Sequence, residues 1–303
     1  MFWLPIDDIS NRVKGIRINT LDTELFRIDY SKLEHRYNFM LALPQTDTEA
    51  IMELRLNELG VQVERGTTLI SFEQTPTLVT AMVECEGAKD AIKARYLIGA
   101  DGANSSVRDI AGISFPGSAM PHEWSLADVR MQSPWPVEPA NILLRKEGML
   151  FALRIKDDLY RLGSNRPNVL ENLPQGLIVK ETLWQTQFEV SHRQVNRYQS
   201  GCVFLVGDAA HVHAPMGARG MNMSIEDSVI LIEHLINNTL DQYSSERLRV
   251  GASALRMIKA QTFLVASTNP IVHVIRQYVM PLLIKIPSVN RYLVERMLGI
   301  GYA

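Results

Sequence analysis

Two aspartates each stand at the end of a short apolar segment. Asp101 follows the mainly apolar residues 96–100, and Asp208 follows residues 202–207. Short apolar runs of this kind are typical of parallel strands buried on both faces, and ligands bind beyond the carboxyl ends of such strands. A carboxylate placed there can accept two hydrogen bonds from a ribose or polyol diol. The sequence therefore predicts a ligand-binding carboxylate at Asp208.

The segment around Asp101 allows two interpretations. Gly102 permits a tight reversal, Asn104 or Ser105 can cap a following helical turn, and Arg108 offers a cation to an anion that docks there. The same pattern is typical of an ordinary strand, loop and helix in which Asp101 is only a capping residue. The residues alone leave both alternatives open.

The loop after Asp208 has the composition of a surface that approaches a flat ligand. Gly217 and Gly220 carry no side chains, so the backbone can come close to such a ligand. The helix predicted at about 223–237 points its N-terminus at this loop, where unpaired N–H groups and the helix dipole favour negative charge.

Polar residues around this helix start have ordinary interpretations as well. Ser224 and Asp227 have the spacing of a capping box, which would place the first helical turn later in the chain. Glu226 and Asp227 are then expected as acids of the first turn. His211 and His213 stand one residue apart with no third candidate ligand nearby, so we expect them to belong to the loop rather than to hold a metal.

Sequence patterns elsewhere predict the elements that position these residues. Residues 13–29 are predicted to form a hairpin with a turn near 19–22, and residues 46–59 a helix that opens with a cap-like pattern at 46–49. An apolar stripe is expected along this helix, at Ala50, Ile51, Leu54, Leu56 and Leu59. Short strands are expected near 61–64, 67–73, 78–85, 91–99 and 203–206.

The middle and the end of the chain have different patterns. Between 118 and 197 apolar and polar residues alternate, with turn residues at 147–148 and 157–158, which favours an antiparallel sheet. The C-terminal third reads as helices punctuated by prolines. Its most apolar stretch, 260–275, contains Pro270 and is too short for a membrane span, so a packed helical region is expected.

Composition excludes several classes of function. The 303 residues favour one large domain or two unequal ones, and the formal net charge of −2 with scattered Lys and Arg gives no footprint for nucleic acid or an anionic membrane. A small-molecule partner is expected. Cys85 and Cys202 suggest neither a disulfide framework nor a zinc site, and the first residues do not read as a signal peptide, so a cytoplasmic protein is predicted.

The two strand-end segments resemble the Asp-Gly and Gly-Asp flavin motifs of the FAD-dependent single-component (class A) aromatic-ring monooxygenases. Residues 43–45, residues 124–129 and the Asn269-Pro270 pair are also similar to that family. The resemblance implies a p-hydroxybenzoate hydroxylase-like α/β fold. Its parts are a Rossmann-like three-layer FAD/NAD(P)-binding domain, an antiparallel β-sheet substrate lobe and a helical C-terminal segment.

The resemblance also implies a division of the chain by function. Residues 30–117 and 198–240 would be portions of the FAD-binding domain, residues 1–29 and 118–197 the substrate-binding β lobe, and residues 241–303 the C-terminal helical segment. The lobe and the hairpin at 13–29 would form one wall of the substrate pocket.

Site residues follow from the resemblance position by position. Asp208 would bind the ribityl chain of FAD, and the backbone of Pro215 would lie near the reactive edge of the flavin, the one catalytic position. Gln45 would lie beside the ribityl or pyrophosphate region, and Asp101 with Arg108 would support flavin and nicotinamide binding. The other implied cofactor-binding positions are Gly102, Gly207, Ala209, Gly217, Gly220, Met221 and Asn222. No metal is implied.

The implied reaction is hydroxylation of a phenolic or polyketide-like aromatic substrate. NADPH or NADH would reduce FAD, O2 would add to give a flavin hydroperoxide, and a hydroxyl group would pass to the ring, while the protein keeps the pocket dry. The choice of nicotinamide and the identity of the substrate are not readable, and the oligomeric state is left open, with a homodimer as one alternative.

One departure from the family concerns the ADP half of FAD. No position in the chain matches GxGxxG, so we expect the chain to lack the N-terminal βαβ unit that binds the pyrophosphate. Impaired FAD binding would follow. The alternatives are a fragment of a working hydroxylase, an inactive flavin-free remnant or ligand-binding protein, and a half completed by another polypeptide. A flavin-dependent reductase is a further alternative, whereas a halogenase is disfavoured because no Trp-x-Trp-x-x-Ile segment is present.

Overall fold

The computed structural model describes residues 4–21, 23–136, 140–145, 148–171, 173–267 and 269–300. The chain divides into two compact units. Unit 1 comprises residues 1–62, 121–189 and 262–303, and unit 2 comprises residues 63–120 and 190–261. Compact units do not test a division made by function, so the predicted cofactor-binding, substrate-binding and C-terminal parts stay a prediction.

The predicted N-terminal hairpin is confirmed in unit 1. β2 (Gly15–Asn19) pairs with β3 (Glu24–Asp29) in antiparallel register, with Ile16 opposite Ile28. Asp22 of the predicted turn lies outside the described residues. The smaller elements of this unit's first part are α1 (Leu4–Ile9), β1 (Asn11–Val13), η1 (Tyr30–Lys32) and β4 (Met40–Ala42).

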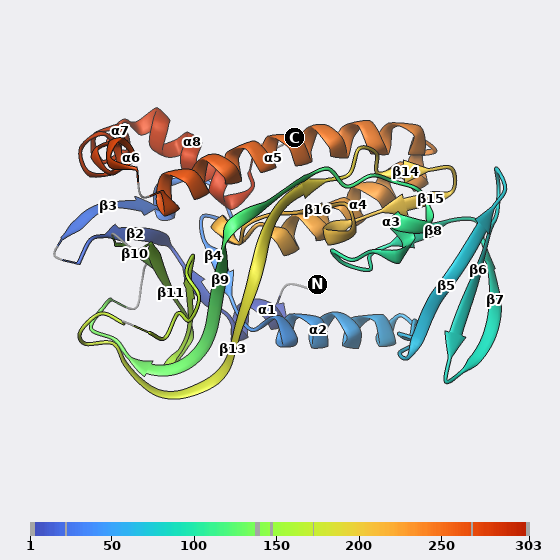
Figure 1. Cartoon of the computed structure of the whole chain (residues 1–303), viewed down its shortest axis with the longest axis horizontal. Helices are drawn as coiled ribbons and strands as arrows, with labels where there is room; N and C mark the ends of the chain where they lie inside the picture. The colour runs from blue at the N-terminus through green and yellow to red at the C-terminus, as the bar shows by residue number, and fades with distance from the viewer. Residues whose placement is uncertain are drawn as a thin grey trace. The chain divides into compact units, whose positions relative to one another are not determined.

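The predicted antiparallel region is also confirmed, and it joins the hairpin in one sheet (Figure 1). Its strands are β9 (Gly117–Gln132), β10 (Ala140–Leu144), β11 (Met149–Lys156), β12 (Leu159–Ser164) and β13 (Ile178–Gln194). The sheet order runs β13-β9-β12-β11-β10-β2-β3, and only the β10 to β2 pairing is parallel among its described pairings in unit 1. The predicted turn at 157–158 joins β11 to β12, whereas Glu147 of the other turn lies outside the described residues.

Helix α2 (Gln45–Glu58) matches the predicted helix, but two details of the prediction were wrong. The N-cap residue is Pro44, and no side chain makes a capping hydrogen bond there. Thr48 of the predicted cap-like pattern lies inside the helix, where its hydroxyl donates to the Pro44 carbonyl at 3.4 Å. Leu54 and Leu59 of the predicted apolar stripe are exposed, whereas Thr48 is buried. Apolar spacing alone therefore did not indicate which side of the helix is covered.

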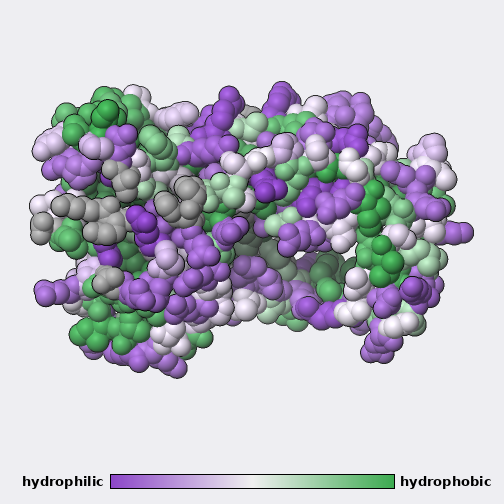
Figure 2. Space-filling model, in the orientation of Figure 1, coloured by the Kyte–Doolittle hydropathy of each residue, from purple (hydrophilic) through white to green (hydrophobic). Residues whose placement is uncertain are grey.

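The C-terminal part is helical, as predicted, and three of its prolines lie at the first or second position of a helix. The helices are α5 (Leu240–Ala266), α6 (Pro270–Val274), a π-helical turn (Ile275–Val279), α7 (Met280–Leu283) and α8 (Pro287–Leu298). Figure 2 shows hydrophobic side chains over α6 and α7, where Ile271, Val274 and Leu282 are exposed. No helix among the described residues is long and apolar enough to cross a membrane.

Unit 2 contains the two predicted strand-end motifs side by side. β8 (Leu97–Gly99) pairs in parallel with β15 (Val203–Leu205), and β14 (Gln199–Ser200) pairs with β15 on its other side. The expected parallel arrangement is confirmed. The predicted strand at 91–99 is in fact two strands, because β7 (Ala88–Ala94) belongs to a different sheet from β8.

A separate antiparallel sheet completes the strands of unit 2. Its members are β5 (Thr67–Gln74), β6 (Val79–Cys85) and β7, which confirms the strands expected near 67–73 and 78–85. The strand expected at 61–64 was wrong, since these residues form no strand.

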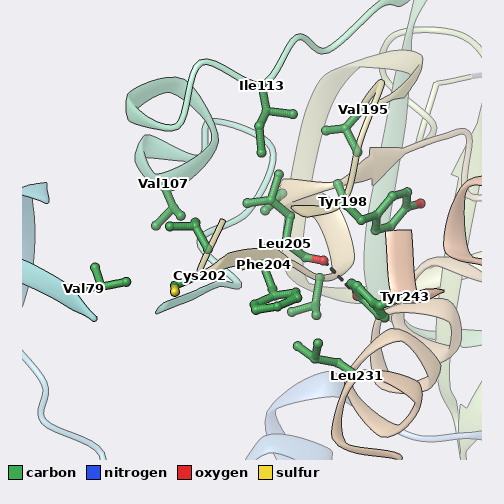
Figure 3. Packing of buried hydrophobic residues seen from close by; sticks show 14 residues of the cluster. Val79, Val107, Ile113, Val195, Tyr198, Cys202, Phe204, Leu205, Leu231 and Tyr243 are labelled. Atoms are coloured by element: carbon green, nitrogen blue, oxygen red, sulfur yellow. Dashed lines mark hydrogen bonds between the residues drawn. The ribbon is translucent and has the colours of Figure 1, made fainter. Parts of the chain in front are cut away.

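The core of unit 2 is built around β15, whose three residues are all buried. Phe204 makes edge-on ring contacts with Tyr96 and Tyr243, at centroid distances of 5.8 and 6.0 Å. The Tyr243 hydroxyl donates to the carbonyl of Leu205 at 2.9 Å, as the dashed line in Figure 3 marks. This packing fixes the strand that carries Asp208.

Candidate cofactor-binding site

Asp208 lies directly beyond the end of β15, in the single 3-10 turn η2 (Gly207–Ala209). Val206, the residue before this turn, is held to the neighbouring strand β8, because its N–H donates to the carbonyl of Gly99 at 3.0 Å. The Asp208 side chain is exposed and has no hydrogen-bond or ion-pair partner among the described residues. Its two oxygen atoms are thus available to a ligand.

Gly207 is required for the approach of the next helix to this turn. Its φ is +62°, and a Cβ added there would lie 2.9 Å from the Ser224 hydroxyl oxygen. A side chain at position 207 would therefore meet both backbone strain and a steric clash. Packing therefore explains the glycine of the Gly-Asp pair, whereas the Asp208 side chain takes no part in this packing.

The loop between Asp208 and the next helix contains two consecutive residues in the left-handed region. Gly217 has φ +76° and Ala218 has φ +52°. Such a conformation costs a non-glycine residue roughly 1–2 kcal/mol. Ala218 is held there by contacts on both sides, since its N–H donates to the Pro215 carbonyl at 3.3 Å and its carbonyl accepts from Asn222 Nδ2 at 3.1 Å.

Helix α4 (Gly220–Asn237) begins immediately after this loop. The predicted capping box was wrong: the N-cap is Arg219, which makes no side-chain cap, and the Ser224 hydroxyl donates back to the Gly220 carbonyl at 3.0 Å. The first N–H groups of an 18-residue helix thus start at Gly220, three residues earlier than predicted. Met221 is exposed beside them.

Asp227 is the buried centre of the site and not the first-turn helix acid that the sequence suggested. Its Oδ2 accepts from the Gly207 N–H at 2.9 Å and contacts His211 Nε2 at 2.8 Å. Its Oδ1 accepts from Arg247 Nε at 2.7 Å. Asp227 is fully buried and Arg247 only 2% exposed. One carboxylate therefore ties together the Gly-Asp turn, the strand after it, and α5.

Sequence reasoning missed this role, although a signal was present. Met223, Asp227 and Leu231 are the buried residues of α4, and they follow one another at four-residue spacing. An acid in the middle of such a buried helix face needs a buried cation, and Arg247 meets that need. Glu226 also binds Arg247, at 2.9 Å from Nη1.

The Asp-Gly segment has internal partners that favour its structural interpretation. Asp101 accepts hydrogen bonds from the Ser105 hydroxyl and from the Val107 N–H, so it stabilises the start of α3 (Ser106–Ile110). Ser105 is the N-cap, as one of the two expected residues, and its hydroxyl accepts from the Arg108 N–H at 3.0 Å. A cofactor role for Asp101 and for Gly102, which has φ +79°, stays a prediction.

Arg108 is buried and joins the two motifs. Its guanidinium donates to the carbonyls of Ala103 at 3.0 Å and Ala209 at 3.3 Å, and it lies 4.2 Å over the ring of Phe115. These contacts hold the turn at Asp208 against the Asp-Gly segment. The predicted contact of Arg108 with a bound anion is untested by them.

Gln45 belongs to unit 1, apart from the other predicted site residues. It is the first residue of α2, and its Nε2 donates to Glu49 Oε1 at 2.8 Å. Its role beside the flavin stays a prediction, as does the role of the Pro215 backbone. A cavity of about 770 Å³ in unit 1, between β3 and α7–α8, is lined by none of the predicted flavin residues.

Three histidines lie close to the loop. His211 is buried, and the His213 ring stacks parallel to it at a centroid distance of 6.3 Å. Burial lowers the pKa of His213 below its usual value, and burial together with the charge of Lys259 lowers the pKa of His192. Among the described residues, no group of His, Cys, Asp and Glu could hold a metal ion.

Parallel strands, a carboxylate that follows a glycine beyond one of them and a helix that starts at the same loop form the kind of α/β site in which ligands bind at the carboxyl ends of strands. The family model described as FAD binding domain matches residues 9–152 and 164–257. The chain belongs to this family, and the predicted class of aromatic hydroxylase and mixed α/β fold are confirmed.

Two known relatives and two solved structures show how far the similarity extends. The chain is 32% identical over 92% of its length to an uncharacterized aromatic compound monooxygenase of Bacillus subtilis, and 30% identical over 88% to a 12-dehydrotetracycline 5-monooxygenase/anhydrotetracycline 6-monooxygenase of Streptomyces rimosus. It spans only 61% and 59% of these relatives.

Solved structures give the same picture. An anhydrotetracycline hydroxylase from Streptomyces rimosus superposes with a TM-score of 0.79 at 28% identity, covering 99% of this chain and 65% of that one. A p-nitrophenol 4-monooxygenase from Pseudomonas putida superposes with a TM-score of 0.88 at 20% identity, covering 98% and 84%, and at this identity supports the fold alone.

Removing the carboxylate of Asp227 should strongly destabilise the protein. Asp227→Ala leaves the buried Arg247 with only the partly exposed Glu226 as its acid, and it removes the acceptor of the Gly207 N–H and of His211. We expect a loss of about 3–5 kcal/mol in the free energy of unfolding, measured by urea denaturation. Glu233→Ala, on the exposed side of the same helix, is the control and should change the stability by less than about 0.5 kcal/mol. Equal effects of the two substitutions would contradict the role assigned to Asp227.

Relieving the strain at Ala218 should stabilise the protein. Ala218→Gly removes the cost of the left-handed conformation at the expense of some unfolded-state entropy, so we expect a gain of about 0.5–1 kcal/mol in thermal or urea unfolding. Ala252→Gly, in the middle of α5, should have the opposite sign. A loss of stability in both variants would refute strain at position 218.

The buried histidines should make the protein less stable in mild acid. Because the folded-state pKa values of His192 and His213 are lowered, the unfolded chain binds protons first as the pH falls below about 6.5. Stability is therefore complete above that pH and should decline below it, by at most about 1.4 kcal/mol per pH unit for each histidine. Urea denaturation between pH 5 and 7.5 measures the slope, which should flatten in the His192→Gln/His213→Gln double variant.

Proposed function

We propose that this chain is the core of an FAD-dependent monooxygenase that hydroxylates an aromatic substrate. The carboxylate of Asp208 is the observation that carries the proposal, because it is exposed and has no partner in the described part of the chain, whereas the backbone of Gly207 and Ala209 on either side is hydrogen-bonded. We assign it to the ribityl hydroxyls of FAD. Two relatives that are named as monooxygenases of aromatic or tetracycline-type compounds support the reaction class.

The residues on the loop fit a flavin. Asp208 offers two acceptors for a diol, Gly217 and Gly220 leave backbone uncovered, and α4 directs its first N–H groups at the same loop. Bound FAD would supply the redox chemistry that links NAD(P)H, O2 and the aromatic ring. The chain's own part is to hold the ring system flat and to favour negative charge at the helix start.

The substrate side of the proposal rests on unit 1. Its antiparallel sheet, with the hairpin β2–β3 at one edge, is assigned to one wall of the substrate pocket. The names of the relatives favour an aromatic or tetracycline-type substrate. We assign NADPH or NADH as the reductant. The whole relatives are longer than this chain, so these assignments describe the enzyme to which such a core belongs.

The edge of β8 supports the expectation that a further segment completes the flavin site. β8 pairs only with β15 among the described strands, and Ile98 on it is 45% exposed. A small groove beside this edge is lined by apolar side chains, namely Tyr96, Ile98, Phe204, Leu231, Ile232, Leu235 and Leu240. Parallel strands normally have both faces covered. We propose that a strand and helix carrying a glycine-rich turn cover this edge and bind the ADP half of FAD.

Substitution of Asp208 tests the proposed role in flavin binding. In Asp208→Ala the two acceptors for the diol are lost, and we expect the dissociation constant for FAD to rise about ten- to a hundredfold, measured by the visible spectrum and flavin fluorescence during titration of the purified chain. Asp90→Ala, which removes an exposed acid of the same unit, should bind FAD like the unmodified chain.

The same titration separates the alternatives. Flavin bands on the unmodified chain that are unaffected by Asp208→Ala would refute the ribityl role. A chain that remains colourless at high FAD concentration would favour the flavin-free remnant or ligand-binding protein, unless adding a glycine-rich strand and helix restores binding.

A further inference from the structure

His192 belongs to β13, and His213 directly follows the short strand that pairs with the end of β13. β13 and β16 (His211–Val212) are antiparallel, with Arg193 opposite Val212. Continuing this register by one residue places His213 opposite His192. Side chains alternate between the faces of a strand, so the two imidazoles share a face. A pair of histidines thus lies at the point where the chain leaves β16 for the flavin loop.

Each of these imidazoles has one buried nitrogen without a partner. His213 Nδ1 lies 2.9 Å from the Ala214 carbonyl, so Nδ1 carries the proton and Nε2 is an acceptor. Among the described residues, this Nε2 and the Nδ1 of His192 are both buried with no hydrogen-bond partner. His192 as a whole is only 7% exposed. Buried polar atoms without partners are rare and usually mark a ligand or ordered water.

Burial and the neighbouring charges keep both imidazole rings neutral. Lys259 on α5 and Arg219 in the loop are the cations that act on the pair, Asp208 is the acid that acts on His213, and His211 is already engaged with Asp227. Neutral imidazoles can each offer one donor and one acceptor. Among the described residues, no group that could hold a metal ion includes them. The position therefore suits a neutral ligand group that both donates and accepts.

A hydroxyl group has that property. We propose that His192 and His213 form a binding site for a ligand hydroxyl: Nε2 of His213 accepts the O–H, and Nδ1 of His192 donates to the oxygen. The charges of Asp208 and of Arg219 in the loop act on His213, so the site lies beside the surface already assigned to flavin. The hydroxyl belongs either to the ribityl chain of FAD or to a phenolic substrate, and the first source rests on the proposed function.

Gly220 leaves room at this position. A Cβ on Gly220 would lie 3.9 Å from Cε1 of His213, so the ring is bordered on that side by a residue without a side chain. The first turn of α4 and the His213 ring are therefore neighbours. Asp208 acts electrostatically on His213, so we place the hydroxyl site on the same side of unit 2 as the Asp208 carboxylate.

The experiment compares probes that differ only in the hydroxyl. Riboflavin and lumiflavin share a ring system, but lumiflavin lacks the ribityl hydroxyls; phenol and anisole share a benzene ring, but anisole lacks the O–H. Binding of each probe to the purified chain is measured by flavin fluorescence or by saturation-transfer NMR. The variants are His213→Leu, His213→Gln, His192→Leu and, as a matched control on the exposed surface of α6, His273→Leu.

If the ribityl chain is the source, His213→Leu should weaken riboflavin about tenfold and leave lumiflavin unchanged. His213→Gln keeps an acceptor near the place of Nε2 and should remain within about threefold of the unmodified chain. If the substrate is the source, the same loss should appear for phenol and not for anisole, while both flavins bind as before. His192→Leu should follow His213→Leu for the same probe.

The remaining outcomes distinguish failure of the hydroxyl site from failure of the proposed function. Equal binding of all four probes by His213→Leu and His273→Leu would overturn the hydroxyl site while leaving the flavin proposal intact. A chain that binds neither flavin, even after a glycine-rich strand and helix are added, would contradict the proposed function, and the phenol and anisole pair would then decide the site alone. The melting curve of His213→Leu shows whether this variant folds. If it does not fold, the site is supported when His213→Gln still binds riboflavin or phenol and His192→Leu does not. Binding of the same probe by both variants contradicts the site.

Discussion

The buried ion pair between Asp227 and Arg247 is the interaction on which the site depends. A carboxylate with no exposed surface is tolerated only when every oxygen atom has a donor, and here the donors come from a backbone N–H, a histidine and an arginine on three different elements. The Gly207 N–H is one of these donors, so the geometry of the Gly-Asp turn is set from inside the protein. Asp208, the next residue, can then keep its carboxylate exposed and unpaired because it has no structural duty.

The two aspartates at the strand ends, Asp101 and Asp208, differ in the hydrogen bonds that their carboxylates make. Both carboxylate oxygens of Asp101 accept hydrogen bonds at the start of α3, whereas the Asp208 carboxylate accepts none among the described residues. Arg108 connects them through the Ala209 carbonyl. The Asp-Gly segment thus acts as a support that holds the Gly-Asp turn in place. This division explains why the two motifs have to lie on adjacent parallel strands.

Sequence patterns were sufficient for features that depend on local chemistry. Alternation in 118–197, the hairpin at 13–29 and the apolar strands before Asp101 and Asp208 all correspond to observed strands, since burial on one or two faces leaves a direct trace in composition. Features that depend on contacts distant in sequence were not readable. Asp227 looked like a helix-start acid because its partner Arg247 lies a full helix away, and Leu54 looked buried because spacing does not say what covers a helix. The edge position of β8 also follows from pairing and not from its residues.

That edge has a consequence for handling the protein. Among the described strands β8 pairs on one side only, and its free edge, beside an exposed isoleucine, can offer N–H and C=O groups to an extended chain that meets it. β8 has no proline, and none of its three residues is charged, so nothing on it discourages such pairing. When this chain is produced by itself, self-association through β8 competes with the folded monomer, and its yield in solution will depend on protein concentration and on how the β8 edge is covered.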